Sequence, residues 1–144
     1  MRLSPLGLKM LQSRESCRLE AYQDDAGIWT IGWGSTGPGI ASGTIWTQAQ
    51  ADQNLISAIE AIEQSIACMV TIQVSDDEWD ALVSFAYNEG LGALHDSQLL
   101  AELNRGNITE AANQMMHWVF VKGEPDDGLY KRRKSERAQF LGRL

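Results

Sequence analysis

Three side chains near the N-terminus have residue types and a spacing suited to hydrolysis of a glycosidic bond. Eight residues separate Glu15 from Asp24, and five separate Asp24 from Thr30. Such hydrolysis needs one carboxylic acid to protonate the leaving oxygen, and a second carboxylate acting from the other side of the sugar. A threonine hydroxyl can hold a water molecule nearby. These three residues are therefore candidates for a hydrolytic site.

Glu15 is the candidate for the acid because we expect it in the last turn of a helix. Exposed carbonyls at that end carry partial negative charge, which would raise the pKa of a nearby carboxyl. A general acid working near neutral pH needs such a shift. Chemistry alone leaves Glu20 and Asp25 as alternatives. A solvated glutamate, an aspartate in a turn and a threonine in a strand are also common structural features.

The elements that position these residues are predicted to be a helix followed by a small glycine-rich sheet. Ser4 and Pro5 are typical of a helix start, and the helix should run to about Cys17. Residues 28–34 alternate as a strand does, which places Thr30, Gly32 and Gly34 on one face. Trp29, Ile31 and Trp33 lie on the other. Glycine in a strand often marks a place where a ligand comes close.

Three capping-box patterns predict the starts of later helices: Thr47 to Gln50, Ser75 to Glu78 and Asn107 to Glu110. The first should open a long helix that ends near Met69. Gly106 should stop the helix before the third pattern. Trp79 and Trp118 lie on apolar helical stripes and are expected in the core. A break at 125–128 should precede a final basic helix.

Composition limits the possible functions. Hydrophobic residues make up 44% of the 144 residues, and the formal net charge is −7. An acidic chain disfavours nonspecific nucleic-acid binding. No apolar run is long enough to span a membrane, and the N-terminus lacks the pattern of a secretory signal. Residues 131–144 hold six basic residues and Glu136, so they could face an anionic polymer or form a solvated helix.

No metal site is expected, because the sequence has no cluster of Cys and His at ligand spacing. His95 and His117 each lack a second ligand, so we interpret them as ordinary residues. Cys17 and Cys68 are too few for a disulfide framework and are expected to be partly buried thiols. Trp33 and Trp46 could stack on sugar rings, although Trp33 is expected to pack inside.

The segment from Glu15 to Gly34 closely resembles the phage lysozymes of glycoside hydrolase family 24, especially endolysins of lambdoid phages and prophages. It matches their signature of Glu, eight residues, Asp or Cys, five residues and Thr. The flanking runs 18–24 and 27–34 also match, as do later segments at 85–90, 97–104, 116–118 and 128–136. One departure is Ser35, where the family usually has histidine.

The resemblance implies that Glu15 protonates the glycosidic oxygen while Asp24 and Thr30 position the attacking water. The bond would be the β-1,4 link from N-acetylmuramic acid to N-acetylglucosamine in peptidoglycan, hydrolysed with inversion and without a cofactor. Asn88 would contact substrate, or alternatively cap a helix, and Gly32 and Gly34 would line the substrate site. Arg132 and Arg133 would either include a partner of Glu15 or be surface charges.

The fold expected from this resemblance is α+β and mainly helical. It consists of one lysozyme domain over 1–144, with a small β lobe at about 18–46. A helical lobe comprises 1–17 and 71–144, and a connecting helix covers 47–70. The alternatives are a lytic transglycosylase, which cleaves the same bond without water, and a noncatalytic wall-binding protein. An endolysin of this type would be a monomer that accumulates in the host cytoplasm without inserting stably into the membrane. A holin would then release it to the periplasmic peptidoglycan.

Overall fold

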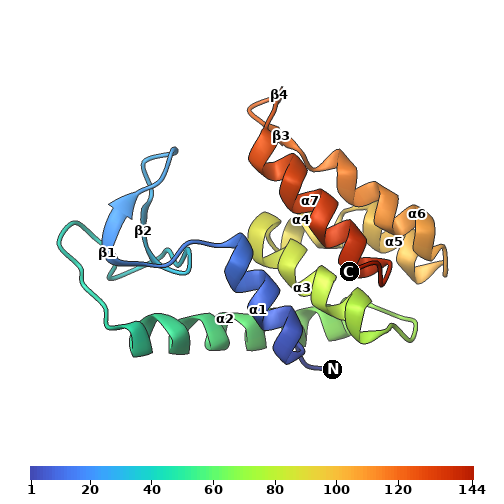
Figure 1. Ribbon diagram of the computed structural model, residues 1–144, viewed down its shortest axis with the longest axis horizontal. Coiled ribbons are helices and arrows are strands. Elements are labelled where there is room, and N and C mark those ends of the chain that lie inside the picture. Colours follow the sequence, from blue (N-terminus) through green and yellow to red (C-terminus); the bar gives the residue numbers. More distant parts are fainter. The chain divides into compact units, whose positions relative to one another are not determined.

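The computed structural model describes residues 1–144 and is mainly helical, with two short antiparallel hairpins (Figure 1). Contacts within the chain divide it into two compact units. One unit comprises Met1–Leu8 and Ala61–Leu144, and the other is Lys9–Glu60. The division falls inside helix α1 (Pro5–Arg14) and inside helix α2 (Gln48–Met69). The expectation of a single domain with the stated lobes stays a prediction.

The unit Lys9–Glu60 holds the first hairpin, formed by β1 (Arg18–Gln23) and β2 (Trp29–Gly32). The two strands pair antiparallel, with Tyr22 opposite Thr30 and Gln23 opposite Trp29. Strand β2 ends at Gly32, whereas the alternating pattern predicts a strand over residues 28–34. It ends there because the chain turns at Gly32, whose φ is +64°. Gly34 therefore lies in a turn and not on the strand, which corrects its predicted place on the Thr30 face.

The capping box at the start of α2 is confirmed. The Thr47 amide donates to the Gln50 side chain at 2.8 Å, and the Gln50 amide donates to the Thr47 hydroxyl at 3.1 Å. Because both of these backbone amides have an acceptor, the helix starts where the pattern predicts. The apolar stripe is also confirmed, with Leu55, Ile59 and Ile66 buried.

The other unit contains five further α-helices and a short 3₁₀ helix. They are α3 (Asp76–Glu89), α4 (Leu91–His95), α5 (Gln98–Asn104), α6 (Ile108–Gln114), η1 (Met115–His117) and α7 (Asp127–Phe140). Helix α3 packs against α7, and α5 packs against α6. The core between them includes Trp79, Leu82, Phe85, Leu103 and Phe140.

The capping box of Ser75 and Glu78 is confirmed, whereas that of Asn107 is wrong. The side-chain amide of Asn107 donates instead to the Glu102 carboxylate at 2.7 Å, and the Asn107 side chain makes no hydrogen bond to the first turn of α6. Gly106 ends the preceding helix with a φ of +84°, as predicted.

A second hairpin, β3 (Phe120–Val121) and β4 (Glu124–Pro125), precedes α7. The predicted break at 125–128 is too long, because α7 already begins at Asp127. Trp118 precedes it and is only half-buried, so its predicted place inside a helix is wrong. Its ring packs edge-on against Phe85, with the ring centroids 5.5 Å apart. No helix is long and apolar enough to cross a membrane.

Candidate active site

All three candidate catalytic residues lie in the unit Lys9–Glu60, each at a different structural position. Glu15 is half-buried and directly follows α1, which ends at Arg14, so the predicted helix end near Cys17 is wrong. The Glu15 amide still donates to the Leu11 carbonyl at 3.1 Å. Glu15 therefore sits at the carbonyl end of the helix, as its proposed role requires.

Asp24 lies in the turn that joins β1 to β2, where its carboxylate organises the backbone. Its Oδ1 accepts hydrogen bonds from the amides of Ala26 and Ile28, both at 2.9 Å. This pattern is typical of an aspartate that stabilises a turn through its own side chain. Oδ2 accepts no hydrogen bond from the protein, and the residue is exposed. One oxygen thus fixes the side chain, and the other remains available to a ligand or water.

Thr30 lies on β2 and is only 5% exposed. Its hydroxyl donates to the Ile28 carbonyl at 2.9 Å. The donated proton leaves the Oγ1 lone pairs free to accept, so the hydroxyl can receive a hydrogen from water but has none left to donate.

The register of the hairpin places Asp24 and Thr30 on the same face. Thr30 is directly opposite Tyr22, and Asp24 is two residues beyond Tyr22 on the same chain. The Asp24 amide also donates to the Ile28 carbonyl at 2.9 Å, which continues the pairing into the turn. Asp24 and Thr30 are therefore diagonal neighbours, a relation that typically spans about 7–8 Å between strands.

The alternative carboxylates have less defined surroundings. Glu20 is exposed on β1, at a bridge to Ile45, and Asp25 is exposed in the turn. Neither side chain receives the pair of backbone hydrogen bonds that holds Asp24. The geometry thus favours Asp24 over Asp25 as the fixed carboxylate.

The turn at 32–35 is tied to the start of α2. The Trp33 indole donates to Asp52 at 2.8 Å, which together with a bond from Gln48 holds the pKa of Asp52 below its ordinary value. The Ser35 hydroxyl donates to Asn54 in α2. Serine at this departure from the family pattern therefore keeps a hydrogen bond to the helix.

Gly32 is close to another side chain within this unit. A Cβ added there would meet the Trp46 ring at 3.1 Å and Ala51 at 3.4 Å. The absence of a side chain thus has a packing reason, whereas the predicted substrate contacts of Gly32 and Gly34 stay predictions.

Arg132 and Arg133 lie in the other unit and are buried, which overturns their interpretation as surface charges and that of α7 as a fully solvated helix. Arg133 is fully buried and pairs with Glu89 at 2.5 Å and with Glu136. Its Nε also donates to the Trp118 carbonyl at 3.0 Å. Arg132 donates to Glu136 at 3.0 Å and to the Ser84 carbonyl at 3.2 Å. Such paired charges connect α7 to α3.

Asn88 is exposed near the end of α3, and its Oδ1 accepts a hydrogen bond from Arg133. The helix is capped by Gly90, whose amide donates to the Ala86 carbonyl, so the alternative of an Asn88 cap is wrong. The bond from Arg133 fixes the Asn88 side chain. Its predicted contact with substrate stays a prediction.

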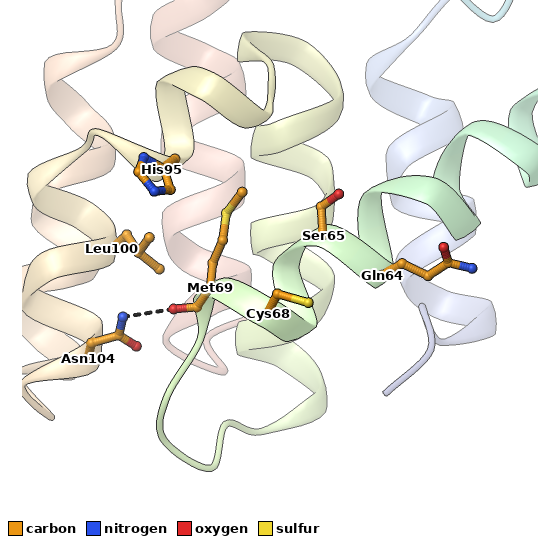
Figure 2. A pocket seen from close by; sticks show the side chains of 7 residues that line it. All are labelled: Gln64, Ser65, Cys68, Met69, His95, Leu100 and Asn104. Atoms are coloured by element: carbon orange, nitrogen blue, oxygen red, sulfur yellow. Dashed lines mark hydrogen bonds between the residues drawn. The ribbon is translucent and has the colours of Figure 1, made fainter.

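A hollow in the unit that contains α3–α7 is lined by none of the candidate catalytic residues (Figure 2). It has a volume of about 690 Å³ and is lined by Gln64, Ser65, Cys68, Met69, His95, Leu100 and Asn104. Asn104 donates to the Met69 carbonyl at 2.9 Å across its lower end. No aspartate or glutamate lines it, so it lacks the acid that glycoside hydrolysis requires.

No cluster of three His, Cys, Asp or Glu side chains is arranged to hold a metal ion. Cys17 is half-buried as expected, whereas Cys68 is exposed, and both are free thiols. His95 pairs with the neighbouring Asp96 at 2.8 Å.

Comparison with known proteins supports the same class of fold. The family model described as phage lysozyme matches residues 12–136. An endolysin of Bacillus phage B103 is 36% identical over 98% of this chain and 54% of its own length, so this chain spans about half of that relative. An endolysin from Escherichia coli O157:H7 phage FAHEc1 has a structure with a TM-score of 0.90 and 35% identity, over 100% of this chain and 96% of that one.

The muramidase domain of SpmX from Asticaccaulis excentricus is also similar in structure, with a TM-score of 0.88 and 33% identity over 97% of both chains. These matches define an α+β, mainly helical, lysozyme-like fold, as predicted. The chain belongs to the phage lysozyme family.

Proposed function

We propose that this chain is a muramidase that hydrolyses the β-1,4 bond between N-acetylmuramic acid and N-acetylglucosamine in peptidoglycan. Glu15 is the general acid, and Asp24 and Thr30 position the attacking water. Membership of the phage lysozyme family supports a glycoside hydrolase. The observation that carries the proposal is the pair of unused acceptors on one face of the hairpin, Asp24 Oδ2 and Thr30 Oγ1.

Two acceptors of this kind would determine how a bound water is oriented. Thr30 has given its proton to Ile28, and an ionised Asp24 has none to give. A water between them must therefore donate both hydrogens, which turns its lone pair away from the protein. Asp24 would then take up a proton as the water attacks the anomeric carbon, while Glu15 protonates the leaving oxygen.

This arrangement predicts inversion at the anomeric carbon. A carboxylate that acts through a water needs room for that water, whereas a nucleophilic carboxylate contacts the sugar directly. Asp24 shares its face with a hydroxyl that can hold water, which favours the first case. No cofactor takes part in these steps.

The proposed biological role is that of an endolysin whose substrate is the host cell wall. In this proposal the chain accumulates as a monomer in the host cytoplasm and reaches the periplasmic peptidoglycan when a holin permeabilises the membrane. Expression alone should leave host cells intact, and lysis should follow permeabilisation with chloroform.

Clearing of a turbid peptidoglycan suspension tests the catalytic assignment. Glu15→Gln should lower the rate by about 10²–10⁴, the usual effect of losing a positioned acid. Glu20→Gln is the matched control and should retain the parent rate. Equal clearing by the Glu15→Gln variant and the parent would refute the assignment.

Mass spectrometry of the released muropeptides tests the reaction type. Hydrolysis adds one water and leaves a reducing end on N-acetylmuramic acid. Anhydro sugars would indicate a lytic transglycosylase instead, and release of no fragment at all would indicate a noncatalytic wall-binding protein.

A further inference from the structure

A shallow groove of about 520 Å³ lies along the first turns of α2, within the unit Lys9–Glu60. It is lined by Trp46, Ala49, Gln50, Gln53, Asn54 and Ser57. Residues 50, 53, 54 and 57 recur at helical spacings of three and four, so they form one stripe on the helix. None of the three candidate catalytic residues lines this groove.

Several polar side chains of the groove have donors or acceptors that form no hydrogen bond within the protein. Gln50 uses its oxygen in the capping box, and Asn54 uses its oxygen to accept from Ser35. The amide nitrogens of both remain without a protein acceptor. The oxygen of Gln53 is also unused, since only its nitrogen contacts Ser57, at 3.4 Å. The groove thus offers at least two donors and one acceptor from neutral amides.

Trp46 gives the groove a fixed aromatic end. It directly precedes the N-cap Thr47, and an edge of its ring lies against Gly32, close to Ala51. An apolar residue in that position packing near the first full turn is the arrangement called a hydrophobic staple. The ring is held on one side by this packing and is half-exposed, and its indole nitrogen has no partner in the protein.

The lining contains no charged side chain, although the chain as a whole carries a net charge of −7. An anionic ligand would meet no cation here, and a cationic ligand would meet no carboxylate. Uncharged sugars suit such a surface, because their ring faces are apolar and their hydroxyls pair with side-chain amides. An acetamido group adds a carbonyl that accepts from amide or indole N–H and a methyl that packs on an aromatic ring.

We propose that this groove is a second carbohydrate-binding site, which takes N-acetylated sugar units of a glycan strand apart from the residues that cleave it. The inference rests on the proposed function in that the strand bound is the cell-wall glycan. Binding here holds an acidic protein on its polymer through neutral contacts.

The test is a titration of ¹⁵N-labelled Glu15→Gln protein, a background chosen to prevent cleavage, with the uncharged tetramer of N-acetylglucosamine. The indole signal of Trp46 and the side-chain amide signals of Gln53 and Asn54 should shift with saturation. The double variant Gln53→Ala, Ser57→Ala in the same background should raise the dissociation constant about fivefold or more, as expected for lost hydrogen bonds. Cellotetraose, which lacks the acetamido groups, should bind more weakly.

Gln98→Ala is the matched control, since Gln98 is an exposed helical glutamine outside the groove. It should leave the dissociation constant unchanged. Shifts confined to the surroundings of Asp24 and Thr30, or no shifts at Trp46, Gln53 and Asn54, would overturn the inference.

The two proposals fail separately. If the parent protein clears peptidoglycan but the signals of the groove residues do not shift, only the second site is refuted. Saturable binding in the groove without clearing would refute only the muramidase.

Discussion

At the residue scale, Asp24 combines a structural and a chemical role in one carboxylate. Its Oδ1 closes the turn through two backbone amides, and Oδ2 is left for water. The sequence spacing singles out Asp24 by resemblance, whereas chemistry alone could not separate it from Asp25. The distinction depends on which carboxylate the backbone amides hold, and this follows from the turn geometry rather than from residue type.

Asp24→Asn should separate these two roles. Asparagine retains an oxygen that can accept from Ala26 and Ile28, so the turn and the unfolding temperature should be preserved. The negative charge is lost, so the rate of peptidoglycan clearing should fall about 10²–10⁴-fold. Asp25→Asn serves as the matched control, with clearing near the parent rate. A similar fall in both variants would show that the role belongs to the charge of the turn as a whole.

Arg133 shows a second limit of sequence reasoning at this scale. A run of basic residues favours a solvated helix, yet this guanidinium is fully buried between carboxylates and a backbone carbonyl. Arg133→Met should leave Glu136 buried with one partner fewer, and so lower the free energy of unfolding by about 3–5 kcal/mol. Urea denaturation measures this, and Lys134→Met at the exposed neighbouring position should change it by less than about 0.5 kcal/mol. Equal effects would mean that Arg133 contributes no more than a surface charge.

At the element scale, capping boxes are predicted correctly where both capping residues bond only to each other, within one turn of the chain. The pairs Thr47 with Gln50 and Ser75 with Glu78 form their reciprocal bonds within four residues, so the sequence contains everything required. Helix α6 also starts where predicted, with Asn107 as its N-cap, but the reciprocal bonds are missing because the Asn107 side-chain amide donates to Glu102, which lies outside the pattern.

The second hairpin was missed because each of its strands has only two residues, too few to show an alternating pattern. Its turn consists of Lys122 at φ +49° and Gly123 at φ +80°, and only the glycine is a residue type typical of this turn.

The start of α1 depends on a close approach that only glycine permits. The buried Asp80 carboxylate accepts from the amide and hydroxyl of Ser4, and a Cβ on Gly7 would lie 2.3 Å from its Cγ. Gly7→Ala should therefore displace Asp80 and lower the free energy of unfolding by about 1–3 kcal/mol. Gly92→Ala is the control: no atom lies within 4 Å of its added Cβ, and alanine should stabilise α4 by up to about 1 kcal/mol. Thermal unfolding compares the two, and stabilisation by both would rule out the proposed clash.

The link between the 32–35 turn and α2 should weaken in acid. Hydrogen bonds from Trp33, and then Gln48, lower the folded-state pKa of Asp52 below its ordinary value of 3.8, while slight desolvation opposes them. Their contribution to stability is present above that ordinary value and is lost as the pH falls through the lower folded pKa. Asp52→Asn should therefore unfold at a slightly lower temperature than the parent at pH 7, and the gap should narrow as the pH falls below the ordinary value of 3.8. A gap that stays constant throughout the acid range in which the protein remains folded would contradict this linkage.

At the scale of the whole molecule, charge sets how the chain meets its proposed substrate. The net charge is −7, and part of the basic C-terminal segment is neutralised internally, because Arg132 and Arg133 pair with buried Glu136. Peptidoglycan is itself anionic, so long-range forces should oppose the encounter at low salt. Raising the ionic strength from about 0.01 to 0.1 M shortens the screening length from about 30 to 10 Å, which should speed clearing over this range. The measurement is the initial clearing rate against sodium chloride concentration, with a cationic lysozyme as the comparison that slows as salt rises. A steady decline for this chain would instead show that its exposed Lys131, Lys134 and Arg143 guide binding.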